Sequence, residues 1–175
     1  MVDRYIPNDD EYRIVICDNV NIFTPERGFN LRDTITMFSS NHCVRLRNIY
    51  GFTMVNIQQQ AADKEGNETF KLDRLTPSPD GLGDCKTTAR DCNVMLGLFS
   101  PYRFKKSTWE GYNVGLFQDN IRFLEVCVDR NGSSGAVCPL YFDGAVNFFA
   151  ELPAPSNHTG LTPYLELAKK AQGLC

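Results

Sequence analysis

The sequence predicts a mainly β protein of the α+β class: an antiparallel sheet or sandwich of about eight short strands with one or two helices, stabilised by disulfides. Two observations lead to this prediction. Short apolar or alternating runs recur along the chain with turn residues between them, and the chain contains seven cysteines. The 175 residues fit a single globular domain spanning 1–175, because a chain of this size buries about 70% of its unfolded surface.

The expected strands are runs rich in β-branched or aromatic residues and bounded by turn signals. In chain order they are 12–17, 43–47, 52–58, 69–75, 93–99, 112–117, 121–129, 136–142 and 145–151. Residues 48–51 are expected to close a hairpin between the second and third of these strands. Asp119-Asn120 and Asp143-Gly144 are expected to form two further hairpin turns.

Two segments carry helix signals. Thr24-Pro25-Glu26 combines an N-cap residue with proline at the first helical position, and 30–38 is the stronger part of that helix. The second helix is expected over 162–171, where a threonine cap precedes Pro163 and two lysines suit the negative end of the helix dipole. Gly173 is expected to end it. Residues 76–83 form the strongest break, interpreted as a surface loop between two halves of one domain.

Composition narrows the class of protein. Hydrophobic residues make up 42% and charged residues 22%, which is typical of a globular chain. The formal net charge of -3 argues against a dedicated nucleic-acid-binding protein, which normally shows a basic surface. No apolar run is long enough to span a bilayer.

The cysteines are interpreted as disulfide-forming, because no pair has the spacing of zinc ligands and only two histidines are present. No metal or other cofactor is expected. Cys127 and Cys138 would face each other in a symmetric hairpin, although a tighter turn would pair Cys127 with Ala136 instead. Cys85 and Cys92 are expected to close a short loop. The remaining candidates are Cys17, Cys43 and Cys175, and the odd number leaves one thiol over.

Three glycosylation sequons begin at Asn67, Asn131 and Asn157. With the cysteines they favour a secreted, extracellular protein, although no signal peptide precedes the acidic segment near Met1.

Residues with catalytic chemistry form no recognisable site. His42 and Cys43 are neighbours, and on the expected strand they would point to opposite faces, so they could not act as a base and nucleophile. The segment 81–84 is interpreted as a turn rather than a phosphate loop, for want of a third glycine and a lysine-serine/threonine pair directly after it. The sequence therefore predicts a protein that is not an enzyme.

The most distinctive candidate for a binding site interleaves aromatic and basic side chains, which can stack on rings and attract anions. Its members are Tyr102, Arg103, Phe104, Lys105, Lys106 and Trp109. A second interpretation places the three aromatic rings in the core and the three cations in water. If the stretch is a loop, its aromatic and arginine side chains suit a protein partner.

The favoured hypothesis is a secreted, non-enzymatic interaction protein of the effector or host-receptor-binding kind, contacting an extracellular or host protein. The alternative is a β-barrel that binds a small ligand or a carbohydrate. A hydrolase with an unrecognised site is the third hypothesis.

Overall fold

The computed structural model describes residues 10–60, 76–83 and 85–174. The chain divides into two compact units. Unit 1 comprises Met1–Lys64 and Pro79–Asn93, and unit 2 comprises Glu65–Ser78 and Val94–Cys175. The expectation of a single domain stays a prediction.

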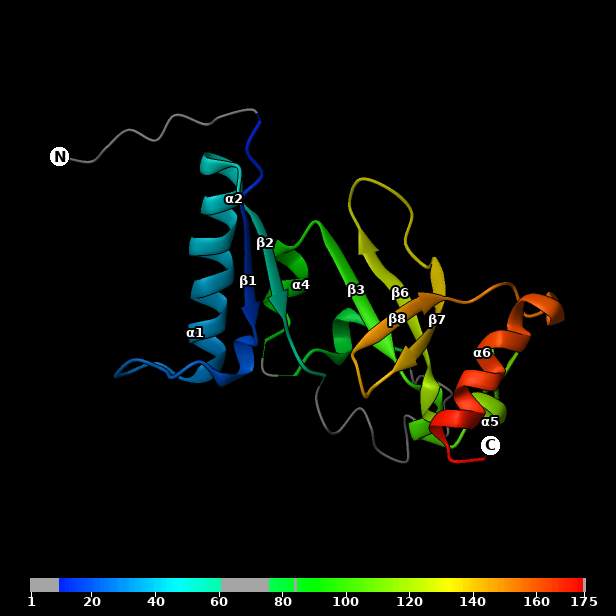
Figure 1. The fold of residues 1–175 in the computed structure, drawn as a ribbon. Coiled ribbons are helices and arrows are strands. Elements are labelled where there is room, and N and C mark those ends of the chain that lie inside the picture. Colours follow the sequence, from blue (N-terminus) through cyan, green and yellow to red (C-terminus); the bar gives the residue numbers. More distant parts are fainter. Residues whose placement is uncertain (1–9, 61–75, 84, 175) are drawn as a thin grey trace. The chain divides into compact units, whose positions relative to one another are not determined.

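Unit 1 is built on two parallel strands joined by a long helical connection (Figure 1). Its elements are β1 (Ile14–Asp18), η1 (Val20–Ile22), α1 (Leu31–Met37), the π-helical turn η2 (Phe38–Cys43), α2 (Val44–Tyr50), β2 (Thr53–Ile57), η4 (Pro79–Gly81) and α4 (Thr87–Asp91). Ile14 of β1 pairs with Thr53 of β2, and Asp18 pairs with Ile57, so both strands end at the same edge. A β-helix-β unit of this kind belongs to α/β architecture rather than to an antiparallel sandwich.

The expected strand over 43–47 is wrong, and so is the hairpin that would follow it. Residues 31–50 are helical throughout, because Asn30 caps the first turn by accepting the Asp33 N–H and Gly51 ends α2 in the left-handed conformation, with φ of 68°. A short apolar run does not distinguish strand from helix by periodicity alone. The helix expected over 30–38 is confirmed, but it begins at Leu31 and not at Thr24-Pro25-Glu26.

The buried core of unit 1 is small. Val20, Ile35 and Cys85 form it, with partly buried side chains such as Phe23 and Phe38 against them. The rings of Phe23 and Phe38 meet edge to face, with centroids 4.9 Å apart. Large apolar side chains on β1 and β2 stay exposed, among them Ile16 at 65%.

Unit 2 contains a four-stranded antiparallel sheet in the order β3-β6-β7-β8. Its elements are β3 (Val94–Phe99), η5 (Pro101–Phe104), β4 (Thr108–Trp109), β5 (Tyr112–Asn113), α5 (Val114–Phe117), η6 (Gln118–Asn120), β6 (Ile121–Asp129), β7 (Val137–Asp143), β8 (Phe148–Glu151) and α6 (His158–Ala171). The sequence prediction of strands over 93–99, 121–129 and 136–142 is confirmed to within one residue at each end. The β7–β8 hairpin at Asp143-Gly144 is confirmed as well.

Two predictions in unit 2 are wrong. The expected strand over 112–117 is only two residues long, after which Asn113 caps the helical turn α5 by accepting the Leu116 N–H. Asp119-Asn120 lies in η6, between that turn and β6, and forms no hairpin. The first difference follows from the Asn113 cap, because it offers the backbone a helical alternative to the sheet.

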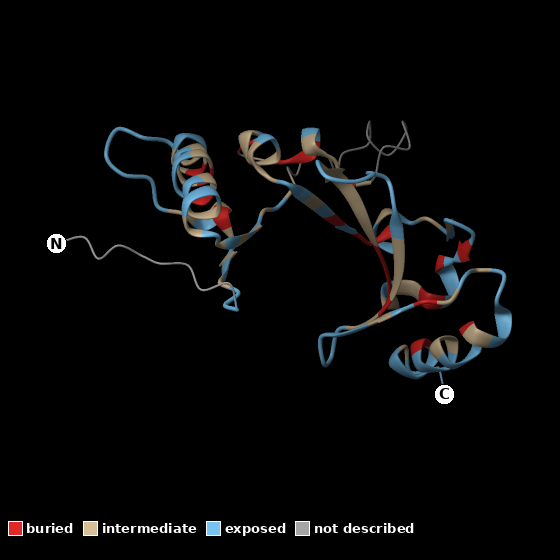
Figure 2. Ribbon diagram, turned by 90° about the horizontal axis from the view of Figure 1, so that it is seen from above, coloured by how far each residue is buried: buried red, intermediate tan, exposed pale blue. Residues whose placement is uncertain are grey.

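The core of unit 2 is larger and lies between the sheet and α6. Ten buried residues form it: Phe99, Tyr112, Val114, Phe117, Ile121, Phe123, Tyr141, Leu152, Leu161 and Ala168. Figure 2 shows the buried positions along the strands of this sheet. Asn157 caps α6, which therefore starts four residues earlier than expected, and Gly173 follows it with φ of 72°.

The prediction of a mainly β, disulfide-stabilised fold is wrong. Twenty consecutive residues of unit 1 are helical, and the six described cysteines carry thiols rather than disulfides. Cys175 lies outside the described residues. Within the part of the chain that the structure describes, no helix is long and apolar enough to cross a membrane.

The expected Cys127–Cys138 bridge fails on register. Cys138 lies opposite Leu124, and the Val126 N–H donates to Ala136 O, so Cys127 is offset along the hairpin. Gly135 takes a left-handed conformation, with φ of 89°, and donates its N–H to Val126 O, which sets this register. The Cys85–Cys92 bridge fails because α4 separates the two thiols: Cys85 contacts the Thr36 hydroxyl, and Cys92 donates to Ala89 O.

Candidate functional site

The carboxyl ends of β1 and β2 form the most distinctive polar edge of unit 1. β1 reads Ile-Val-Ile-Cys-Asp, four apolar residues followed by a carboxylate. Because β1 and β2 are parallel and in register at Asp18 and Ile57, this carboxylate lies beside the residues that follow β2. Ligands of open α/β sheets bind at the carboxyl ends of the strands, so this edge is the first place to look for a site.

Asp18 is exposed, and no described residue bonds to its carboxylate. The turn after it is fixed by short-range hydrogen bonds, since the Asn19 side chain accepts the Asn21 N–H at 3.0 Å. The Asn21 side chain in turn accepts the Gln59 N–H at 2.9 Å, which joins the loop after β1 to the loop after β2. Asp18 is therefore an accessible carboxylate on a rigid support.

Gln58, the first residue after β2, is held in place by α4. Its side-chain nitrogen donates to Cys85 O at 2.9 Å, and its side-chain oxygen accepts the Thr88 hydroxyl at 2.6 Å. The same hydroxyl lies 3.0 Å from Cys85 O. A glutamine fixed at both ends keeps one orientation, which suits a residue that orients a ligand or a water molecule.

The C-terminal end of α4 is hydrogen-bonded to the helical segment 31–50. The hydroxyls of Ser39 and Ser40 both donate to the Asp91 carboxylate at 2.7 Å. The Arg47 guanidinium donates to Asp91 O and to the Asn93 side chain, each at 2.7 Å. The two serines lie in the π-helical turn η2, a feature that often occurs near functional sites.

The segment before α4 resembles a phosphate loop more than the sequence interpretation allowed. Lys86-Thr87 follows the glycine-containing segment 81–84, with Cys85 between them. A phosphate loop nevertheless needs glycine directly before the lysine, where this chain has Cys85, and glycine five residues earlier, where it has Asp80. Lys86 instead pairs with Asp80 at 3.9 Å, and no described strand runs directly into the loop.

Cys43 is buried in unit 1, and burial raises the pKa of its thiol. Its sulfur lies 3.4 Å from the Asn56 side-chain nitrogen, whereas His42 is exposed. The expectation that these two residues do not act together stays a prediction, although its premise of a strand is wrong. No cluster of three metal-ligating side chains occurs among the described residues.

The aromatic-basic stretch divides in two in the structure. Phe104 and Trp109 pack against the unit 2 core, with ring centroids 5.5 Å and 5.1 Å from that of Phe99. Tyr102 is 40% exposed, and its hydroxyl lies 3.4 Å from the Gln118 side-chain oxygen. Arg103 and Lys105 are exposed, and Lys106 lies over the Trp109 ring. The proposed role of this stretch in binding a partner stays a prediction.

The role of the three sequons as glycosylation sites stays a prediction. Asn157 uses its side chain to accept the Gly160 N–H at 2.9 Å. Asn131 lies exposed in the β6–β7 turn, and Asn67 lies outside the described residues.

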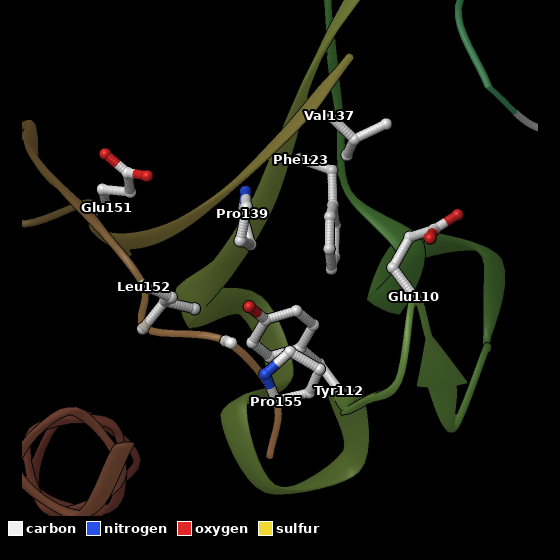
Figure 3. A pocket seen from close by; sticks show the side chains of 9 residues that line it. Glu110, Tyr112, Phe123, Val137, Pro139, Glu151, Leu152 and Pro155 are labelled. Atoms are coloured by element: carbon white, nitrogen blue, oxygen red, sulfur yellow. The ribbon is translucent and has the colours of Figure 1, made fainter. Parts of the chain in front are cut away.

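Unit 2 also contains a pocket of about 340 Å³ (Figure 3). Tyr112 and Phe123 form part of its wall, but both rings are at least 96% buried, and the Tyr112 hydroxyl is already bonded to Pro153 O. The carboxylates of Glu110 and Glu151 lie on opposite sides of it (Figure 3). We therefore place the candidate site at the carboxyl ends of β1 and β2.

A scan against protein-family models found no match, and a search of curated proteins found none either. Among solved structures, the fold is similar to one described as an ATPase domain, with a TM-score of 0.65 at 16% sequence identity. The similarity covers 83% of this chain and 46% of that one, so this chain spans less than half of the similar structure.

This likeness corrects the expectations about class and function. The prediction of a secreted, glycosylated, non-enzymatic effector or receptor-binding protein is wrong, because the matched fold is that of an ATPase domain and the described cysteines carry thiols. The β-barrel alternative fails for a separate reason. The strands of the described residues form one parallel pair and open antiparallel sheets.

Proposed function

We propose that this chain is part of a nucleotide-binding ATPase, in which Asp18 holds a magnesium ion that accompanies the nucleotide. The observation that carries the proposal is an accessible carboxylate directly after four apolar strand residues, at the carboxyl edge of a parallel pair. An aspartate placed in this way is the usual magnesium-binding carboxylate of phosphate-loop ATPases. The fold likeness to an ATPase domain supports the same interpretation.

The single carboxylate of Asp18 fits a magnesium ion that is bound together with a nucleotide. Mg²⁺ keeps several water molecules and usually takes one or two protein carboxylates plus phosphate oxygens, rather than a complete set of protein ligands. A single carboxylate without a three-residue ligand cluster among the described residues agrees with this chemistry. Gln58, the residue that follows β2 at the same edge, is fixed by Cys85 and Thr88.

The sequence contains no Gly-x₄-Gly-Lys-Ser/Thr motif. The proposal therefore rests on the metal side of the site and assigns no phosphate loop to this chain. The chain alone should therefore bind metal–nucleotide weakly, with the metal side of the complex at Asp18.

The test uses paramagnetic broadening, which detects weak binding. Mn²⁺ replaces Mg²⁺, and Mn²⁺–ATP is added to the isotope-labelled chain while amide NMR signals are recorded. We expect selective broadening of the amides of residues 18–21 and 58–59. Asp18→Asn should weaken the effect about tenfold or more, the usual consequence of losing a contact to a charged group.

Glu166→Gln is the matched control, since it also removes one exposed carboxylate, on α6 of unit 2. It should leave the broadening at residues 18–21 unchanged. Equal broadening in wild type and Asp18→Asn, or none near Asp18 in the wild type, would contradict the proposal.

A further inference from the structure

Unit 2 contains a cationic pocket of about 450 Å³ that is separate from the polar edge of unit 1. It is lined by Tyr102, Arg103, Lys105, Lys106, Ser107 and Gly115. Three of these six residues are cations, and none carries a carboxylate. We propose that this pocket binds a compact oligophosphate, such as the triphosphate group of a free nucleotide.

Two of the three positive charges in the pocket are not neutralised from within the described part of the chain. Arg103 and Lys105 form no ion pair or side-chain hydrogen bond with any described residue. Asp119 is already engaged by Arg122, with the guanidinium nitrogen 3.0 Å from the carboxylate oxygen. Burial lowers the pKa of Arg122, and the like charge of Arg103 lowers it further, which agrees with excess positive charge here.

The backbone of the pocket is held by the core, so the segments that carry its cations are fixed before a ligand arrives. The turn η5 is anchored by Phe104, whose ring stacks on Phe99. The Gly115 N–H donates to Ser107 O at 3.2 Å, which ties α5 to the opposite side. A pre-positioned set of donors loses less conformational entropy when it binds.

Lys105 gives a further argument for a ligand. Its backbone is left-handed, with φ of 57°, where glycine is normally preferred and other residues carry strain. The position needs no side chain for packing, because Lys105 is exposed. A lysine where glycine would be less strained suggests that its charge is used, and three cations within four residues suit a multiply charged anion.

The pocket favours a compact ligand over a nucleic-acid strand. Proteins that bind single strands use an extended basic groove with successive stacking rings. Here two of the three rings in the stretch, Phe104 and Trp109, pack against the core, which leaves Tyr102 as the exposed ring.

Trp109 provides the measurement, because it is the sole tryptophan of the chain and Lys106 lies 5.9 Å from its ring centroid. Inorganic triphosphate is titrated into the full chain at low salt with a chelator, which keeps metal out of the assay. We expect a saturable change in tryptophan fluorescence. In Arg103→Gln/Lys105→Gln the dissociation constant should rise about tenfold or more, while the far-ultraviolet circular dichroism stays unchanged.

The charge-matched control is Arg32→Gln/Arg45→Gln, two exposed arginines of unit 1. It should bind triphosphate as the wild type does, and Asp18→Asn should as well, which separates this inference from the proposed function. Equal loss of affinity in the control pair, equal affinity for sulfate, or binding of oligodeoxythymidylate but not of triphosphate would each overturn the proposal.

Discussion

Unit 1 pairs two parallel strands through a helical connection, whereas unit 2 folds four antiparallel strands and α6 around a core of ten buried residues. Among the residues that the structure describes, the buried core cluster of unit 1 has three members. Ile14 and Ile16 on β1 are 61% and 65% exposed, and Val55 and Ile57 on β2 are 41% and 43% exposed.

The difference in core size indicates which contacts stabilise each unit. Parallel strands are normally covered on both faces, and a two-stranded sheet is marginally stable by itself. Unit 2 buries its own apolar residues, while unit 1 depends more on side-chain hydrogen bonds, such as those that Ser39 and Ser40 make with Asp91. The candidate site thus lies on the unit with the smaller core.

The largest loss of stability is expected for a substitution in the buried core of unit 2. Phe123 is 2% exposed and meets Tyr112 edge to face, with ring centroids 5.8 Å apart. Phe123→Ala should lower the free energy of unfolding by about 3–5 kcal/mol, because it leaves a cavity in a closed core. Chemical denaturation of the full chain measures this change. A loss below about 1 kcal/mol would show that the unit 2 core is not the stabilising element.

A smaller effect is expected where β3 is closely packed. A Cβ added to Gly97 would lie 2.3 Å from Pro77 Cβ and 2.9 Å from Cys127 Sγ, both closer than atoms can approach. Gly97→Ala should therefore cost about 1–3 kcal/mol through overpacking, as measured by the denaturation midpoint. Gly28→Ser offers a contrast, since nothing lies within 4 Å there and only its φ of 94° opposes the change. An unchanged midpoint for Gly97→Ala would contradict this packing.

The smallest change in the free energy of unfolding is expected for an exposed strand residue of unit 1. Ile16→Ser removes an apolar side chain that is 65% exposed, so the free energy of unfolding should change by less than about 0.5 kcal/mol. The same substitution at Ile121, which is fully buried in unit 2, should cost several times more. Paired denaturation curves give both values. A large loss at Ile16 would show that β1 is covered in solution.

The sequence predicted unit 2 better than unit 1, for identifiable reasons. Residues 121–129 and 136–142 are apolar-rich runs bounded by turn residues, so the local pattern is sufficient to predict both strands. Residues 43–47 alternate apolar and arginine side chains over too few positions to separate strand from helix, and the caps at Asn30 and Gly51 decide for the helix. In the candidate site, four apolar residues before Asp18 are the signal that the sequence offers.

Three strands of unit 2 and its β7–β8 hairpin were predictable from the sequence, since they depend on residues close together in the chain. Three other features depend on the tertiary structure. β1 pairs in parallel with β2, which places Asp18 opposite Ile57, at the edge where both strands end. The β6–β7 register separates Cys127 from Cys138. Phe104 turns inward while Arg103 and Lys105 stay exposed. Each depends on contacts between distant residues, which local periodicity does not contain.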